Sequence, residues 1–495
     1  MIAKIRNKNI VFFMIILSAA LLCAGGLHGD LPLPEDSCIY LSLAQAMTKG
    51  LGYTYTVEPI DRPANYHPPA YPAMLFPLAY FFPRNYIVPK ILSIILTLIL
   101  ICVIFYSSGA IFKDAGAIFV VALIAFNALF IFYSRQILTE MPYLLFSFIA
   151  VYFLERFSQA KQIVSRYLFI AAFSMAAAFY TRSIGVSLVI AALIYFIFQR
   201  EVRKGIALAS LFFISVLPWA YYSARIGKNI YMSEFEGATK GIGELFHRVI
   251  YNLAATVGKE LPDLFFYPFL NSIDPRSFVF IFKFLLGGAI AIVLLSGFLK
   301  KIKEKGAWFF DVYSLVYFCF YLSWTHHGAR YLVPLLPFLV YYLFFGIKSL
   351  IKRGSLSMGV IYLIIFLNVS GNIKEIIRER NNPYQPAESS FISALDWLKN
   401  NVSQESVILS RRNNFVYMYT DGYRGLKLLR ATDTRKQYDY IMDNKVDYIV
   451  IDQNKIYRDD TRDYLFPLVW DYPDSFKMAY ASPKNPRTYV YRVNR

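Results

Sequence analysis

Long apolar runs, separated by short polar connections, fill most of the chain up to residue 370. Several of these runs reach the roughly 17 to 25 residues that an α-helix needs to cross a bilayer. In chain order they predict about eleven spans, at 10–27, 87–108, 117–133, 141–157, 167–180, 184–198, 205–223, 278–299, 307–325, 331–347 and 355–370. We interpret the first run as a retained span rather than a signal peptide, because no clear small-residue cleavage site follows it. The pattern therefore predicts a polytopic α-helical membrane protein.

One apolar segment does not fit this series. Residues 69–82 are apolar but few, and Pro72 and Pro77 interrupt them. Counting this segment as a span would move every later loop to the opposite side of the membrane. We therefore predict a re-entrant or interfacial helix that packs against protein, where irregular backbone at membrane depth is tolerated.

The pattern changes after residue 370. Residues 381–383 read Asn-Asn-Pro, and the periodicity beyond them is typical of a soluble domain. An amphipathic helix is predicted at 390–400 and buried strands at 407–409 and 448–451. The sequence thus predicts two domains. The first is a transmembrane domain at 1–370 with outer loops at 28–86 and 224–277. The second is a small α/β domain at 371–495, whose sequence has no glycine-rich nucleotide-binding fingerprint.

Charge adds an orientation to this picture. The chain is 57% hydrophobic, with a formal net charge of +18 and a mean hydropathy of +0.42. Lysines and arginines gather in alternate short loops, whereas the opposite short connections carry single arginines. The positive-inside rule then places the N-terminus in the cytoplasm and the C-terminal domain outside a plasma or inner membrane. The positive charge is a topology signal, and it does not indicate a nucleic-acid partner.

Candidate chemistry begins just after the first span. Glu35 and Asp36 are adjacent carboxylates that open a predicted short helix, Asp36 to Leu51, with Asp36 suited to the N-cap and Tyr40 on its apolar face. A glycine-rich turn, Gly50-x-Gly52, follows this helix. Later in the same loop His67 precedes two prolines.

Further charged groups lie in the short outer turns between spans. These groups are Arg135, Glu140, Arg182, His326, His327 and Arg330, with Tyr331 beside the last. Charged side chains at membrane depth are costly, roughly 2.5–3.5 kcal/mol each on insertion scales, and usually face a cavity or a partner. The set therefore predicts one outer cavity for an anionic, hydroxylated substrate. Three alternatives stay open: arginines as interfacial anchors, Glu140 as favourable charge at a helix start, and the histidines as a solvated helix end.

A divalent metal ion is a further alternative. Asp36, Glu140, His326 and His327 are the candidate ligands, although their spacing matches no recognised ligand signature.

The order of these elements resembles the GT-C superfamily of membrane glycosyltransferases. The resemblance is to the branch that contains protein O-mannosyltransferases and the aminoarabinose transferase of lipid A. The matching elements lie within residues 10–350: Glu35-Asp36 with Tyr40, His67-Pro68-Pro69 with Tyr71-Pro72, Arg135 with Thr139-Glu140-Met141-Pro142, Thr181-Arg182, and Arg330-Tyr331 ahead of Pro334 and Pro337. Relatives often carry lysine where this chain has His67.

The resemblance implies a sugar donor linked to a lipid phosphate and a catalytic acid in the first outer loop. That role falls on Asp36, with Glu35 beside it. Donor-phosphate and substrate contacts fall on Tyr40, His67, Arg135, Glu140, Arg182, Arg330 and Tyr331.

Nucleotide sugars are cytosolic, so an outer site needs a donor that crosses the membrane, as a polyprenyl-phosphate sugar does. Asp36 can act as general base for an acceptor, and Arg182, Arg330 or a metal ion can stabilise the leaving phosphate. The acceptor is a lipid, a glycan or a protein, and single displacement predicts inversion. A glycan polymerase or ligase and a flippase for lipid-linked sugars are the alternatives; clustering of ionisable groups at one face favours chemistry over transport.

Overall fold

A computed structural model describes residues 2–29, 33–111, 116–227, 241–270, 277–420, 422–429, 431, 433–454 and 461–494. The chain divides into two compact units. The first, the helical unit, comprises Met1–Leu27, Asn65–Tyr71 and Ile87–Ile377. The second, the mixed unit, comprises His28–Ala64, Pro72–Tyr86 and Arg378–Arg495, so it joins most of the first predicted outer loop to the C-terminal domain.

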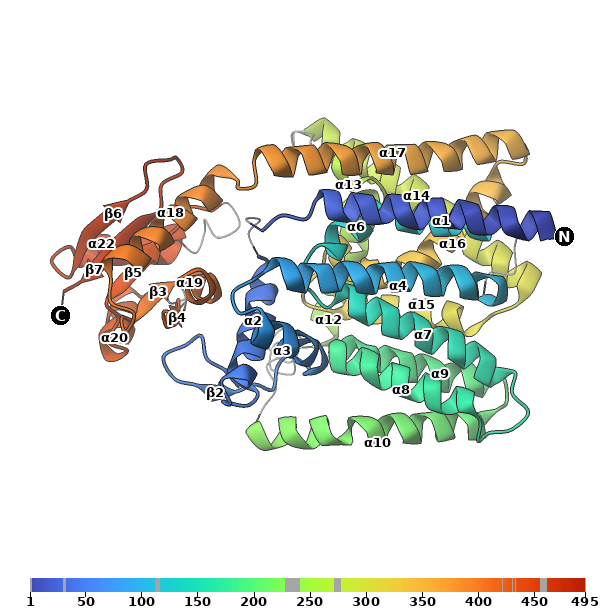
Figure 1. Ribbon diagram of the computed structural model, residues 1–495, viewed down its shortest axis with the longest axis horizontal. Coiled ribbons are helices and arrows are strands. Elements are labelled where there is room, and N and C mark those ends of the chain that lie inside the picture. The colour runs from blue at the N-terminus through green and yellow to red at the C-terminus, as the bar shows by residue number, and fades with distance from the viewer. Residues whose placement is uncertain are drawn as a thin grey trace. The chain divides into compact units, whose positions relative to one another are not determined.

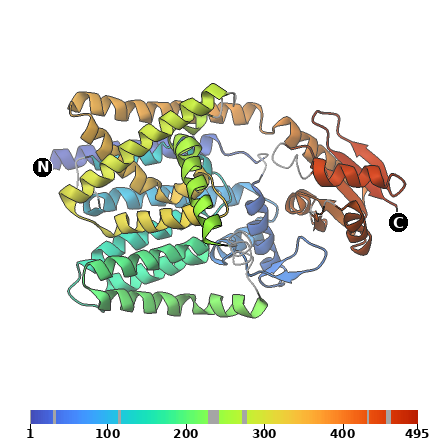
Figure 2. The same cartoon turned by 180° about the vertical axis from the view of Figure 1, so that it is seen from behind.

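The helical unit is a bundle whose long helices run side by side (Figure 1). Its elements are α1 (Ile2–Gly25), α4 (Ile87–Ile111), α5 (Ala117–Ala125), α6 (Ala128–Ser134), α7 (Glu140–Ser158), α8 (Arg166–Thr181), η1 (Ser183–Gly185), α9 (Val186–Phe198), α10 (Val202–Ile226), α12 (Ile242–Ala255), η2 (Thr256–Glu260), α13 (Leu261–Leu270), α14 (Ser277–Lys305), α15 (Phe309–Ser323), η3 (Ala329–Leu335), α16 (Leu336–Leu350) and α17 (Gly354–Asn381). Every predicted span coincides with helix, and α12 lies crosswise to the long helices (Figure 2).

The predicted number of spans is not reproduced. In the described part of the chain, six stretches are long and apolar enough to cross a membrane, or seven if α5 and α6 form one bent span. The others are too short or too charged: α8 has 16 residues, α9 has 13 and α15 has 15, and α7 carries charge at both ends. A helix that is covered by other helices rather than lipid does not need a full apolar length, and α7 is largely buried.

The bend between α5 and α6 shows how the unit accommodates broken helix. The two segments meet at 57°. The Asn127 side chain accepts the Phe130 N–H and donates to the Leu264 carbonyl at 2.7 Å. Asn368 accepts the Ala128 N–H at 3.0 Å, and Asn372 donates to the Phe126 carbonyl. These amides satisfy backbone groups that the break removes from the helical ladder, as burial in an apolar unit requires.

Close helix contact is achieved through glycine between α14 and α16. A Cβ at Gly297 would lie 1.9 Å from the Tyr342 carbonyl oxygen, and one at Gly346 would lie 1.9 Å from that of Val293. The two backbones therefore touch at positions where no larger residue fits, a mode of packing that suits helices in lipid.

The mixed unit contains a five-stranded sheet in the order β4-β3-β5-β7-β6. Strands β4 (Gly425–Lys427), β3 (Ile408–Ser410) and β5 (Tyr448–Ile451) pair in parallel. Strand β7 (Tyr489–Val493) is antiparallel to both of its neighbours, β5 and β6 (Phe476–Ala481). Its helices are α18 (Pro386–Asn401), α19 (Asn413–Tyr419), α20 (Thr434–Asp443), η4 (Thr461–Leu465) and α22 (Phe466–Asp471). The predicted helix and both predicted strands are present as α18, β3 and β5.

The first predicted outer loop contributes α2 (Glu35–Thr48), β1 (Thr54–Tyr55) and β2 (Arg62–Pro63) to the mixed unit. The predicted N-cap was wrong: Pro34 occupies that position, without a side-chain cap, and Asp36 lies inside the first turn. Gly50 and Gly52 have φ of +74° and +70°, which favours glycine, so the predicted turn is present. The predicted short apolar helix is α3 (Ala70–Phe81), too short to span a bilayer.

Candidate active site

Three of the predicted charged residues meet in the helical unit. Glu140 is the first residue of α7, Arg182 follows α8, and Arg330 lies in η3. One carboxylate oxygen, Oε1 of Glu140, accepts from Nη1 of Arg182 at 2.7 Å and from Nε of Arg330. A carboxylate at a helix start is also stabilised by the helix dipole. The backbone thus brings three separate turns to one point, which we call the Glu140 cluster.

The Glu140 cluster carries a net positive charge, because two guanidinium groups share one carboxylate. The Glu140 side chain is 0% exposed, whereas those of Arg182 and Arg330 are 14% and 23% exposed. The Arg182 guanidinium lies 5.7 Å from the ring centre of Tyr331, and the Tyr331 carbonyl accepts from the hydroxyl of Tyr317 at 2.9 Å. The carboxylate is therefore enclosed, whereas both arginine side chains keep some exposed surface.

Arg135 has a different set of bonds. Its Nε and Nη1 donate to the carbonyls of Ile131 and Gly26, at 3.3 and 3.1 Å. A Cβ at position 26 would lie 1.5 Å from Nη1, so only glycine leaves room for this contact. Arg135 thus connects the ends of α1 and α6, a contact that sequence reasoning did not anticipate.

The predicted histidine pair leads to a residue that sequence reasoning missed. His327 Nδ1 lies 2.9 Å from Oε1 of Glu260, in the π-helical turn η2. The hydroxyls of Tyr321 and Thr256 also donate to this carboxylate. Burial raises the pKa of Glu260, and His327 opposes that rise. Single π-helical turns are frequent at functional sites, but a sequence pattern does not reveal them.

The remaining predicted residues are divided between the units. His67 belongs to the helical unit, where it is buried with its ring 4.5 Å from that of Tyr66 in an edge-to-face contact. Glu35 and Asp36 belong to the mixed unit, both partly exposed in the first turn of α2. Tyr40 is buried one turn further along the same helix.

The candidate metal ligands do not form a set in the described residues. No group of three His, Cys, Asp or Glu side chains comes together there in a way that could hold a metal ion. Glu140 pairs with arginines and His327 with Glu260. We therefore derive no catalytic step through a metal.

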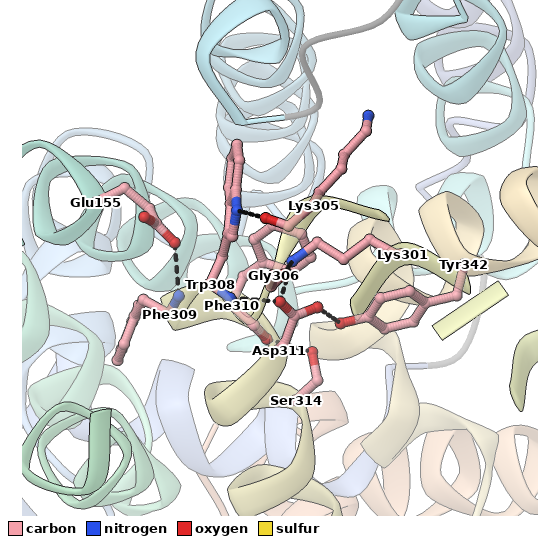
Figure 3. Close-up of polar contacts among 10 residues, drawn as sticks. All are labelled: Glu155, Lys301, Lys305, Gly306, Trp308, Phe309, Phe310, Asp311, Ser314 and Tyr342. Carbon is pink, nitrogen blue, oxygen red and sulfur yellow. Dashed lines mark hydrogen bonds and ion pairs between the residues drawn. The ribbon is translucent and has the colours of Figure 1, made fainter. Parts of the chain in front are cut away.

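A second buried charge cluster lies at the other end of α7. Lys301 is fully buried and pairs with Asp311, which also accepts from the Tyr342 hydroxyl at 2.8 Å (Figure 3). Nearby, Glu155 accepts the Phe309 N–H at 2.6 Å. Glu155 follows Glu140 by fifteen residues, which corresponds to about 22 Å along the helix. This second cluster thus fixes the turn between α14 and α15 far from the Glu140 cluster.

Comparison with known proteins finds a family resemblance over part of the chain. Residues 66–222 match the model of the dolichyl-phosphate-mannose-protein mannosyltransferase family. The match includes Glu140 and Arg182. The predicted resemblance to GT-C glycosyltransferases is confirmed. No curated protein matches the chain.

Solved GT-C structures share the fold over nearly the whole chain. ArnT from Cupriavidus metallidurans bound to undecaprenyl phosphate is 13% identical, with a TM-score of 0.61 and 97% of each chain covered. The oligosaccharyltransferase AglB from Archaeoglobus fulgidus, in complex with an inhibitory peptide and a dolichol-phosphate, is 12% identical, with a TM-score of 0.59. That match covers 98% of this chain and 74% of AglB. An AglB complex with zinc and sulfate has a TM-score of 0.62, at 12% identity over 98% of this chain and 73% of that one. The chain is therefore a polytopic helical membrane protein of GT-C fold with a C-terminal mixed-sheet domain.

Proposed function

We propose that this protein is an integral-membrane glycosyltransferase that moves a sugar from a polyprenyl-phosphate donor to an acceptor on the outer face of the membrane. The family match over residues 66–222 supports transfer of a sugar. Likeness to structures that contain undecaprenyl phosphate or dolichol-phosphate supports a lipid-phosphate donor.

The observation that carries this proposal is the Glu140 cluster. Two arginines on one buried carboxylate leave a net positive charge, and both keep part of their side chains exposed. A guanidinium has five N–H donors, so it can bond to a carboxylate and to a phosphate together. The buried carboxylate orients both arginines without cancelling their charge. Such a fixed array is suited to a phosphate that gains negative charge during reaction.

The proposed reaction is a single displacement at the anomeric carbon. Asp36 removes the proton from the acceptor hydroxyl or amine, whose oxygen or nitrogen forms the new bond to that carbon. The bond between the carbon and the phosphate oxygen breaks, and its electron pair leaves with the polyprenyl phosphate. Arg182 and Arg330 stabilise the leaving phosphate, and the configuration inverts. Glu35, Tyr40, His67, Arg135 and Tyr331 are proposed to complete the substrate contacts around these groups.

The charge asymmetry of the loops supports the proposed orientation. Short loops rich in lysine and arginine would lie in the cytoplasm, and the C-terminal domain outside. The same rule assigns the connections that carry Glu140, Arg182 and Arg330 to the outer side, as it does the loop that carries Glu35 and Asp36.

A second candidate function is transfer of a whole glycan by a ligase or polymerase. It is favoured by the similarity to the oligosaccharyltransferase AglB, which covers 98% of this chain. Both candidates share the same donor chemistry and differ in what is transferred.

The test is to incubate the purified full chain with a panel of radiolabelled polyprenyl-phosphate sugars, including lipid-linked oligosaccharides, and a membrane acceptor fraction. Loss of label from one lipid and its appearance on the acceptor is the expected result. Labelled oligosaccharide on the acceptor would favour the ligase. Movement of intact labelled lipid across a vesicle membrane, without loss of label, would contradict both and indicate a flippase.

A further inference from the structure

The helix that carries the acidic pair is packed against the C-terminal domain. Within the mixed unit α2 packs on α19, and Cys38, two residues after Asp36, is fully buried. Burial raises the pKa of the Cys38 thiol, and the Arg412 charge opposes that rise. The placement of the acidic pair therefore depends on α19.

The backbone just before α2 is held by a hydrogen bond to a side chain of α19. Pro34, its N-cap residue, provides no side-chain hydrogen bond to the first turn. Instead, the Leu33 N–H, immediately before the cap, donates to the hydroxyl of Tyr419 at 3.0 Å. This hydrogen bond holds the residue before the N-cap, and not an N–H group of the first turn itself. Tyr419, the last residue of α19, thus binds the backbone three residues before Asp36.

Residues 56–58 of the first predicted outer loop are hydrogen-bonded to the same region of the C-terminal domain. Thr56 donates to the Tyr417 hydroxyl at 3.2 Å, and the Gly425 N–H donates to the Val57 carbonyl at 2.8 Å. Arg424 Nη1 donates to the carbonyls of Thr56 and Glu58, at 2.9 and 2.8 Å. These bonds join residues more than 350 positions apart, and residues 28–64 belong to the same compact unit as the C-terminal domain.

We propose that Tyr419 is a positioning residue for Asp36, and that the C-terminal domain thereby belongs to the catalytic machinery. This inference rests on the proposed function, in which Asp36 is the general base. The Tyr419 hydroxyl fixes where α2 begins, and so where its first-turn carboxylates point. Arg182 and Arg330, which stabilise the leaving phosphate in the proposed function, belong to the helical unit, so we expect loss of the Tyr419 hydrogen bond to change turnover and to leave donor binding unchanged.

The experiment compares Tyr419→Phe with Tyr423→Phe in the purified full chain. The Tyr423 hydroxyl donates to the Val402 carbonyl at 2.6 Å inside the C-terminal domain, so its loss removes a similar bond away from α2. Two quantities are measured: the rate of Cys38 alkylation by iodoacetamide in the folded protein, read by peptide mass spectrometry, and kcat and KM for the polyprenyl-phosphate donor.

We expect Tyr419→Phe to accelerate Cys38 alkylation and to lower kcat roughly five- to tenfold, the scale of one hydrogen bond, with donor KM unchanged. Tyr423→Phe should change neither quantity. Equal behaviour of the two variants in alkylation or in kcat would overturn the positioning role. Absence of donor turnover in the wild-type chain would instead overturn the proposed function, so the two failures are distinguishable.

Discussion

Replacing Arg330 with lysine separates a phosphate-binding role from membrane anchoring. Arg330 donates through Nε to Oε1 of Glu140, which also accepts from Arg182. Lysine keeps the positive charge and can also reach a membrane interface with its long stem. It lacks the planar fork of donors that serves a carboxylate and a phosphate together. An anchoring role would therefore tolerate Arg330→Lys, and a phosphate role would not.

The size of the effect follows from the bonds at stake. A lysine that keeps the ion pair with Glu140 loses one charge-assisted hydrogen bond to the phosphate. Such bonds contribute about 1.5–3 kcal/mol. At about 1.36 kcal/mol per factor of ten, kcat/KM for the donor should fall roughly 10- to 150-fold. Arg182→Lys should give a loss in the same range, because Arg182 binds the same carboxylate oxygen.

The assay is the dependence of initial rate on donor concentration, with membrane insertion checked in parallel. Arg156→Lys is a matched control, since Arg156 lies in the last turn of α7 with its guanidinium 5.4 Å from the Tyr152 ring. That geometry resembles Arg182 over Tyr331, but at the opposite end of α7. Unchanged donor kinetics in both Arg330→Lys and Arg182→Lys would refute the phosphate role.

Three further predictions concern topology, stability and pH. Asn401→Cys should react with an impermeant thiol reagent in intact cells and Lys303→Cys should not; the opposite labelling would reverse the orientation. Asp311→Leu should destabilise the protein by about 3–5 kcal/mol, because it leaves the buried Lys301 ammonium without its carboxylate, whereas a joint change of both to apolar residues should be far milder in a thermal unfolding assay. Burial raises the pKa of Asp452, so its contribution to stability is present below the ordinary pKa of 3.8 and is lost as pH rises through the folded value. Asp452→Asn should therefore flatten the fall of the unfolding temperature above pH 4; an unchanged slope would contradict this cause.

Local pattern was sufficient to predict much of the fold. Runs of apolar residues located the long helices, and the β-branched run at 448–451 located β5. The span number could not be predicted in this way, because α8, α9 and α15 are short helices whose length depends on their neighbours. Strand β6 escaped notice because most of it is exposed, and α12 and α13 were missed within 224–277, where polar and aromatic residues mix.

In the candidate site, too, some residues could be predicted from the sequence and others depend on tertiary contacts. Sequence order alone selected Glu140, Arg182 and Arg330, which the structure brings together although 190 residues separate the first from the last. It did not select Glu260, since nothing in the residues around Glu260 indicates a partner 67 positions later. Whether a charged residue bonds to a side chain or, as Arg135 does, to backbone carbonyls is decided by tertiary contacts that local pattern does not contain.

The most direct test of the proposed function measures the leaving group itself. Purified wild-type protein and Asp36→Asn are incubated with a polyprenyl-phosphate sugar and acceptor, and free polyprenyl phosphate is quantified by mass spectrometry. The wild type should release one polyprenyl phosphate for each sugar transferred. Asp36→Asn should insert and fold normally but release none, because the acceptor lacks its base. Release by Asp36→Asn at the wild-type rate would contradict the assignment of Asp36 and the mechanism built on it.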